Sequence, residues 1–298
     1  MTPGRRGLSP QVGMLFVVLF WAGNFTAAKI AFTQLDPLAF TALRFLIAST
    51  VFWMVVRVVE GPAPLPRGAF WQLVCLGVIG NTIYQICFME GLQRTSAIKS
   101  SLIIAGMPAL VTMTAGVLGI ERVTTKQRIA VLVATAGVVA VVLGRGGSLD
   151  HGFGTGEELL LGAVVMWTAY TLMLRRWNLA MSPLRLTAWT MYTGTPGLVI
   201  VGIPAIRHTP WLHIGAAPWA GLFYSSLLSL VAAYTFWNRG VAMLGAARTV
   251  VFNTIVPLVA TVIAIVMLGE RPGWIHVVGG ALIVGGVLLT GGAVPPEG

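Results

Sequence analysis

Charged residues are scarce in this sequence. Asp, Glu, Lys and Arg make up 9% of its 298 residues, whereas soluble globular domains contain roughly 25%. Hydrophobic residues make up 56%, and the mean hydropathy is +0.86. So few charges cannot coat the surface of a soluble protein of this length. The composition therefore excludes an ordinary globular domain and indicates one integral membrane domain.

Cysteine and histidine are also rare. The two cysteines, Cys75 and Cys87, fall in one apolar run, and the four histidines lie near loops or near the ends of such runs. No metal-ligand spacing surrounds either cysteine, and no nucleophile accompanies a candidate base. The sequence therefore argues against a disulfide framework, a metal site, a bound cofactor and a membrane enzyme.

The apolar runs are long enough for ten membrane-spanning helices. A bilayer core about 30 Å thick needs about 20 apolar residues per helix. Nothing between the runs is long enough to fold as a soluble domain. The predicted spans are residues 11–32, 37–57, 68–91, 95–119, 125–144, 154–176, 183–205, 215–240, 246–268 and 273–292.

The formal charge of +10 is explained by orientation in the membrane. In a soluble protein this excess would suggest a nucleic-acid partner, but membrane proteins concentrate Lys and Arg in cytoplasmic loops. Twelve of the 19 basic residues fall on the side of the N-terminus. We therefore expect both termini to be cytoplasmic, in an inner membrane, and no nucleic-acid partner. The five on the other side are Arg94, Lys99, Arg145, Arg207 and Arg271, and Lys29 and Arg44 lie inside spans.

The second half of the chain repeats the first. A shift of 149 residues takes Pro108 to Pro257, and a shift of 146 takes Trp21 to Trp167. Each half holds five spans, an odd number, so the second half must enter the membrane from the opposite side. This arrangement is typical of secondary transporters. The fold expected is all-α and integral to the membrane, with two inverted five-helix repeats that cover residues 1–149 and 150–298.

Small residues line the fifth and tenth spans. At a spacing of four they let helix backbones approach closely in lipid. Because the two spans are equivalent in the repeats, we expect them to pack on each other within a monomer; a homodimer seam is the alternative. The residues are Ala136, Ala140 and Gly144 in the fifth span, and Gly279, Gly280, Ala281, Gly285 and Gly286 in the tenth.

Pro108 and Pro257 fall in the middle of the fourth and ninth spans. Proline removes one backbone hydrogen bond and clashes with the preceding turn, so each helix is expected to kink there. Matched positions in both halves favour a pair of hinges. A static bend that shapes the packing is the alternative.

Short motifs mark several spans. The first span contains the run Trp21–Phe25 (WAGNF), followed by Lys29, and the second contains Pro37 and Arg44. The fourth and ninth spans end in Leu118–Arg122 (LGIER) and Leu268–Arg271 (LGER). These motifs resemble those of the drug/metabolite transporter superfamily, in its ten-helix EamA-like branch, although Ile120 interrupts the first Gly-Glu-Arg signature. Among its members the chain looks most like the YddG-type amino-acid exporters. The resemblance covers nearly the whole chain and implies a ten-helix basket that transports small metabolites.

Polar and aromatic side chains inside the spans are few, and several recur three or four residues apart on one helical face. Unpaired polar groups are costly at membrane depth, so these residues should face the bundle interior or a wet cavity. The alternative is that Asn and Tyr bond across helices and that Trp marks the membrane interface. The candidate substrate-binding residues are Trp21, Asn24, Asn81, Tyr84, Ser101, Trp167, Tyr170, Tyr234, Trp237, Asn238 and Asn253.

Charged residues inside the spans give no support for proton coupling. No Asp or Glu lies in the middle of a span, so the sequence lacks a carboxylate for proton coupling, such as the first-helix glutamate of the distantly related small multidrug-resistance proteins. Arg44 lies about 10 Å deep at 1.5 Å per residue from Pro37. It is expected to extend toward the interface or to pair with Asp36. Glu90 is expected to pair with Arg94 or Lys99.

The pattern favours a zwitterionic or neutral solute, because no buried counter-charge is evident. The leading prediction is export of small metabolites, including aromatic or neutral amino acids, by alternating access around a central cavity. Its partners would be the small-molecule substrate and the lipid bilayer. The alternative is a drug, nucleotide-sugar or sugar-phosphate carrier, for which Lys99 and Arg248 are the candidate phosphate ligands. A membrane enzyme or a scaffold is disfavoured.

Overall fold

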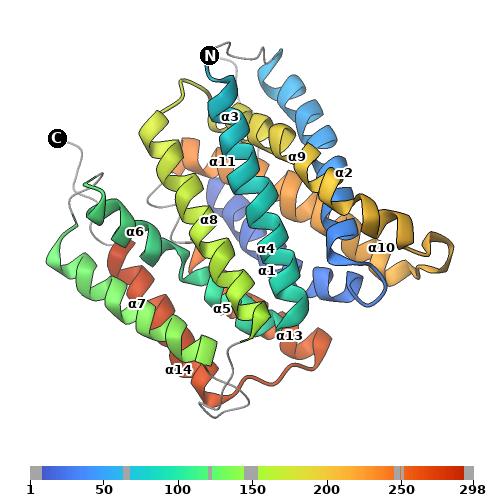
Figure 1. Ribbon diagram of the computed structural model, residues 1–298. Helices are drawn as coiled ribbons and strands as arrows, with labels where there is room; N and C mark the ends of the chain where they lie inside the picture. Colours follow the sequence, from blue (N-terminus) through green and yellow to red (C-terminus); the bar gives the residue numbers. More distant parts are fainter. Residues whose placement is uncertain are drawn as a thin grey trace.

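The protein is a bundle of membrane-length helices (Figure 1). The computed structural model describes residues 9–62, 68–119, 123–143, 154–244, 249 and 252–291, and every regular element in these ranges is helical. Seven helical stretches there are long and apolar enough to cross a membrane. Together with three further helices they coincide with the ten predicted spans, which confirms the all-α membrane fold. The termini, Glu121, Arg122 and the residues from Gly245 to Arg248 lie outside the described residues.

Some of the spans are built from more than one helical segment. The third consists of α3 (Phe70–Gly77), the π-helical η1 (Val78–Ile83) and α4 (Tyr84–Arg94). The fourth consists of α5 (Ala97–Ala105) and α6 (Met107–Val117). The eighth consists of α10 (Ala216–Phe223), the π-helical η3 (Tyr224–Ala232) and α11 (Ala233–Leu244).

The other spans are single helices. They are α1 (Pro10–Ala31), α2 (Pro37–Glu60), α7 (Thr125–Leu143), α8 (Thr155–Trp177), α9 (Pro183–His208) and α14 (Trp274–Gly291). α13 (Val256–Leu268) forms the second half of the ninth span, and a short 3-10 turn, η2 (Trp211–His213), precedes α10.

α1, α2 and α9 begin in the same way, with Ser or Asp followed by proline. The side chains of Ser9, Asp36 and Ser182 accept hydrogen bonds from backbone N–H groups of the first turn. Proline in the first turn removes only an N–H that would have had no partner. These starts fix where each helix enters the bundle.

The fourth span is interrupted at Gly106, two residues before Pro108, where a kink is predicted. α5 ends at Ala105, and α6 begins at Met107 with Pro108 in its first turn. α13 begins in the same way, with Pro257 in its first turn. The hydroxyls of Thr112 and Thr261 each donate to the proline carbonyl four residues back, at 2.8 Å. A proline in the first turn of a segment lacks only an N–H that would have had no helical partner, so an interruption next to each proline agrees with the predicted disturbance of the two spans. Whether they act as hinges stays a prediction.

α7 and α14 pack against each other through glycine. A Cβ added at Gly137 would lie 2.6 Å from the carbonyl oxygen of Gly279, and one added at Gly286 would lie 2.7 Å from that of Ala130. The shift of 149 residues exchanges Gly137 with Gly286 and Ala130 with Gly279, so a twofold relation interchanges these two contacts. The structure confirms the predicted internal contact between the fifth and tenth spans.

The remaining contacts cross between the halves in a matched way. α1 packs on α11 and α13, and α8 packs on α4, α5 and α6. α2 and α9 pack on each other and run antiparallel, because Glu60 at the end of α2 binds Arg185 at the start of α9. Figure 1 shows these two pairs of equivalent helices side by side, α2 with α9 and α7 with α14. The two halves therefore interlock rather than meet at a single face.

We expect Gly286→Ala to destabilise the protein, because the new methyl group would overlap backbone atoms of α7. Overpacking of this kind costs about 1–3 kcal/mol. Gly285→Ala is the matched control on the same helix, since no heavy atom lies within 4 Å of a Cβ there. Thermal unfolding in detergent measures both variants. Equal melting temperatures for the two would show that the seam does not hold the bundle.

Candidate functional site

Two aromatic clusters lie where the halves meet. In one, the Trp21 ring on α1 is 5.8 Å from Tyr234 and 5.2 Å from Trp237, both on α11. In the other, the Trp167 ring on α8 is 5.0 Å from Tyr84 on α4 and 5.1 Å from Tyr170. The two tryptophans are equivalent in the repeat. Six of the eleven candidate residues are therefore brought together, three in each cluster.

The π-helical segments position two of these side chains. Tyr84 directly follows η1, and Tyr234 lies two residues after η3. Each extra residue in a helical turn rotates the later part of the helix by about 100°, and π segments are frequent at functional sites. η3 also binds the first cluster directly, because the indole N–H of Trp21 donates to the carbonyl oxygen of Ser229 at 3.1 Å. No pattern in the sequence indicated these segments.

Arg44 lies on the side of α2 that packs against α4 and η3, the segments that lead to Tyr84 and Tyr234. The residue is only 1% exposed. Its Nη1 donates to the Met89 sulfur at 3.5 Å, and the rings of Phe40 and Phe45 lie 5.8 and 5.7 Å away. Sequence reasoning therefore missed a central cation.

The expectations for Arg44 were wrong. The side chain does not extend to the interface, because it points into the bundle among aromatic residues. It does not pair with Asp36 either, because that carboxylate accepts from the backbone N–H groups of Leu38 and Ala39 and so caps α2. The depth of Arg44 along α2 can be counted from the sequence. The direction in which its helical face points cannot be predicted in this way.

The other candidate residues are engaged in packing between or within helices. Asn24 accepts a hydrogen bond from the Ser225 hydroxyl at 2.5 Å, which joins α1 to η3. The Asn238 amide donates to the Tyr234 carbonyl at 2.8 Å, and the Ser101 hydroxyl donates to the Ile98 carbonyl at 2.8 Å. Asn24 matches the alternative, in which polar residues bond across helices, and so does Asn238, whose amide also donates to the Thr187 hydroxyl of α9 at 3.4 Å. The Ser101 bond stays within α5.

Two asparagines remain apart from both the clusters and these bonds. Asn81 is buried in η1, where its Cβ packs against Gly194 of α9. The side-chain oxygen of Asn253 is buried and has no hydrogen-bond partner. Neither residue takes part in the ring contacts of the two aromatic clusters.

One end of the bundle is held by ionic and polar contacts. At this tied end α1 and α4 finish and α5 and α8 begin. Lys99 of α5 forms an ion pair with Glu157 of α8 at 2.8 Å, and both side chains are less than 10% exposed. Thr95 donates to the same carboxylate at 3.0 Å. Lys29 at the end of α1 donates to the Gln93 carbonyl at 3.1 Å.

The second Gly-Glu-Arg signature contributes to the tied end. The Glu270 carboxylate accepts from the backbone N–H groups of Ala97 at 2.7 Å and Ile98 at 2.9 Å. A carboxylate at a helix N-terminus is favoured by the helix dipole. The signature thus caps α5, the start of the equivalent span in the other half. Its first copy, at Glu121, lies outside the described residues.

The surface pair expected for Glu90 is confirmed, and its partner is Arg94. Lys99, the other predicted partner and a candidate phosphate ligand, is instead held by Glu157. Arg248, the second phosphate candidate, lies outside the described residues. Pairing between Lys99 and a residue 58 positions away has no local signature in the sequence.

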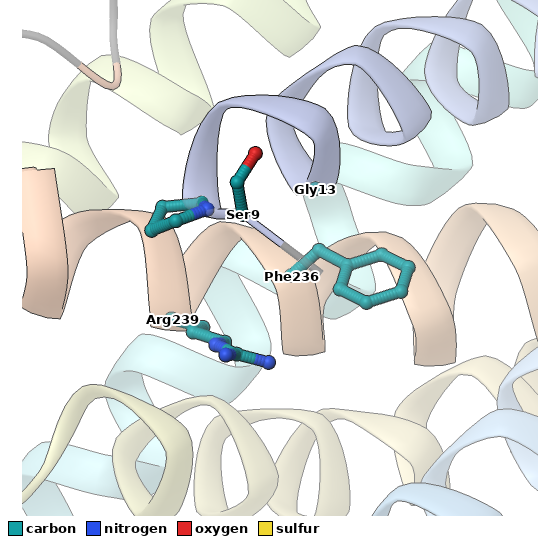
Figure 2. A pocket seen from close by; sticks show the side chains of 5 residues that line it. Ser9, Gly13, Phe236 and Arg239 are labelled. Carbon is teal, nitrogen blue, oxygen red and sulfur yellow. The ribbon is translucent and has the colours of Figure 1, made fainter. Parts of the chain in front are cut away.

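Two hollows open away from the tied end. A groove of about 450 Å³ runs between α6 and α8 toward the end of α8. A cavity of about 10 Å³ lies between the start of α1 and α11, lined by Ser9, Pro10, Gly13, Phe236 and Arg239 (Figure 2). The groove is lined by Leu110, Thr114, Leu118, Val165, Thr168, Ala169, Leu172, Met173 and Arg176. Both hollows lie away from the tied end, and neither is lined by a residue of the two aromatic clusters.

Comparison with known proteins identifies the family. The sequence matches the EamA-like transporter family over residues 9–143 and 154–292. The chain belongs to the EamA-like transporter family. This EamA-like protein is thus a membrane transporter, and the prediction that it is not an enzyme is confirmed by its family and relatives.

Relatives and a solved structure cover nearly all of this EamA-like chain. It is 26% identical to the uncharacterized transporter YyaM of Bacillus subtilis over 282 residues, 93% of this chain and 91% of that one. It is 27% identical over 272 residues to a probable terminal-alkyne amino-acid exporter of Streptantibioticus cattleyicolor, 90% of this chain and 89% of that one. A crystal structure with 19% sequence identity aligns with a TM-score of 0.65, over 94% of this chain and 95% of its own, and supports the fold.

We expect Lys99→Met to destabilise this transporter strongly, because it leaves the buried Glu157 carboxylate without its cation. Breaking a buried ion pair in this way costs about 3–5 kcal/mol, whereas removing both charges is often neutral. Lys99→Met combined with Glu157→Gln should therefore recover most of the loss in thermal unfolding. Arg94→Met is the control and should cost at most about 1 kcal/mol, because its pair with Glu90 is exposed. An equal loss for the two single variants would contradict the assignment.

Proposed function

We propose that this protein is a secondary transporter that exports small metabolites, amino acids among them, by alternating access. The observation that carries the proposal is the pair of aromatic clusters around Trp21 and Trp167. Each cluster is built by helices of both halves, and α2, which carries the buried Arg44, packs on the segments α4 and η3 that lead to them. Largely aromatic walls with a few oriented polar groups are typical of small-molecule sites. The probable amino-acid exporter among its relatives supports this substrate class.

In the proposed cycle two inverted repeats, residues 1–149 and 150–298, exchange their conformations. Antiparallel packing of α2 on α9 and the twofold exchange at the α7–α14 seam support this division. In this arrangement the tied end is closed and the hollows open at the other end. This is one of the two states that alternating access requires. With both termini cytoplasmic, as the basic residues favour, the tied end is the outer end.

A sugar-phosphate carrier is less well supported. A phosphate dianion would need more than one free basic group at the centre. Arg44 supplies a single charge, and the charge of Lys99 is already balanced by Glu157. A drug carrier remains the alternative within transport, and the apolar groove between α6 and α8 is the feature that would favour it.

We expect the purified protein in liposomes to exchange labelled L-phenylalanine for unlabelled L-phenylalanine without a pH difference, because no carboxylate lies at mid-span. Trp167→Ala and Trp237→Ala should each weaken this exchange. Losing an aromatic wall costs on the order of 1–3 kcal/mol, or roughly 5- to 150-fold in affinity for the solute. Trp71→Ala is the control, because that indole is 73% exposed on the outside of the bundle. Normal exchange by folded Trp167 and Trp237 variants would place the site elsewhere.

Single cysteines test the orientation. In a background with Cys75 and Cys87 replaced, a cysteine at Gly4 or Gly298 should be shielded from an impermeant thiol reagent in intact cells, and one at Ser148 should react. The expectation follows from the twelve basic residues on the N-terminal side. Labelling at either terminus would refute the topology with both ends inside.

A further inference from the structure

Arg44 is a buried cation without an anionic partner in the part of the chain that the structure describes. Among the described residues, the ion pairs found join Glu90 to Arg94, Lys99 to Glu157 and Glu60 to Arg185, and none includes Arg44. Its Nε has no hydrogen-bond partner. Its nearest acidic neighbours along the chain and beside Met89 are occupied, since Asp36 caps α2 and Glu90 holds Arg94.

Burying an unpaired charge of this kind destabilises the folded protein. Arginine does not deprotonate in proteins, and burying an unpaired ion costs several kcal/mol. The rings of Phe40 and Phe45 and the Met89 sulfur offset only part of this cost, because cation–π contacts contribute about 0.5–2 kcal/mol each. A role confined to packing would be served equally well by an apolar side chain. An ionisable group inside the membrane is by default a functional-site hypothesis.

The residues around Arg44 indicate which kind of anion would pair with it. The guanidinium donates a hydrogen bond to Met89 on α4, the helix that also carries Tyr84, and α2 packs on η3, which leads into α11 with Tyr234. Phenolic hydroxyls donate hydrogen bonds, and a guanidinium offers two parallel N–H groups that fit one carboxylate. One cation matches one negative charge, so a carboxylate fits better than a phosphate dianion.

We propose that Arg44 binds the carboxylate of the transported solute, with Tyr84 and Tyr234 beside it. The inference rests on the proposed transport function and narrows its substrates to solutes with a free carboxylate. The Trp21 and Trp167 clusters then face the rest of the solute, where a ring or an ammonium group packs against the aromatic walls. Amines, amides and quaternary ammonium compounds lack the group that Arg44 recognises.

Three probes of similar shape test this assignment. L-phenylalanine carries both charged groups, 3-phenylpropanoate only the carboxylate and L-phenylalaninamide only the ammonium. Binding to the purified full-length protein is measured by quenching of tryptophan fluorescence, and transport by exchange in liposomes. We expect the wild type to prefer both carboxylates over the amide. Arg44→Met should lose on the order of 10- to 150-fold in affinity for the carboxylates and little for the amide.

The controls separate this role from a structural one. Arg57→Met makes the same change on the same helix at an exposed position and should leave all three affinities unchanged. Arg44→Lys keeps the charge but loses the two-pronged geometry, so it should bind the carboxylates more weakly than the wild type and still prefer them to the amide. Without solute, Arg44→Met should melt no lower than the wild type, because removing an unpaired buried charge is neutral or stabilising.

Several outcomes would overturn the proposal. If a folded Arg44→Met protein keeps its preference for carboxylates, the carboxylate site is refuted. The proposed transport of amino acids is not affected by that result. If Arg44→Met does not fold, Arg44→Lys decides, and unchanged affinity for 3-phenylpropanoate counts against the proposal. The protein could instead transport 3-phenylpropanoate but not phenylalanine, in a way that depends on Arg44. That result would refute amino-acid export and support the carboxylate site. A wild type that binds only the amide would refute the site itself.

Discussion

Close contact between helix backbones is the constraint on which this bundle depends. In lipid an apolar side chain gains little by leaving the tails for another helix, so association relies on packing and on hydrogen bonds between helices. Gly137 and Gly286 allow α7 and α14 to meet at backbone distance. Because the same contact is made twice by a twofold exchange, it fixes the relation between the halves. The aromatic clusters, each drawn from both halves, inherit their geometry from that relation.

The centre of the bundle concentrates groups that lipid would reject. Arg44, three tyrosines and three tryptophans occupy the region where segments from both halves converge, and π-helical turns precede Tyr84 and Tyr234 there. Elsewhere, polar groups such as Asn24 are bonded across helices. Arg44, by contrast, has no anionic partner among the described residues, which is why we propose that it meets the solute.

The sequence predicts what local pattern determines. Long apolar runs gave the ten spans, the small-residue spacing gave the α7–α14 seam, and the spacing of Trp21 and Trp167 placed equivalent residues in equivalent clusters. It could not predict which face of α2 points inward, so Arg44 was assigned to the interface. Glu157 lies in a first turn, where a solvated acid is usual, and only the fold brings it to Lys99. The π segments depend on packing against neighbouring helices and have no local signal.

The tied end is not reproduced by the repeat. The same shifts that relate the halves take Lys99 to Arg248 but Glu157 back to Gln11, which is neutral, whereas Glu270 corresponds to Glu121. In the alternating-access cycle proposed above, a mirror-image state closed at the other end would have no counterpart of the ion pair between Lys99 and Glu157. The two states would then differ in energy although they share one architecture. Each 1.4 kcal/mol of such a difference is a tenfold bias in population, so an empty carrier would favour the state closed at the Lys99 end.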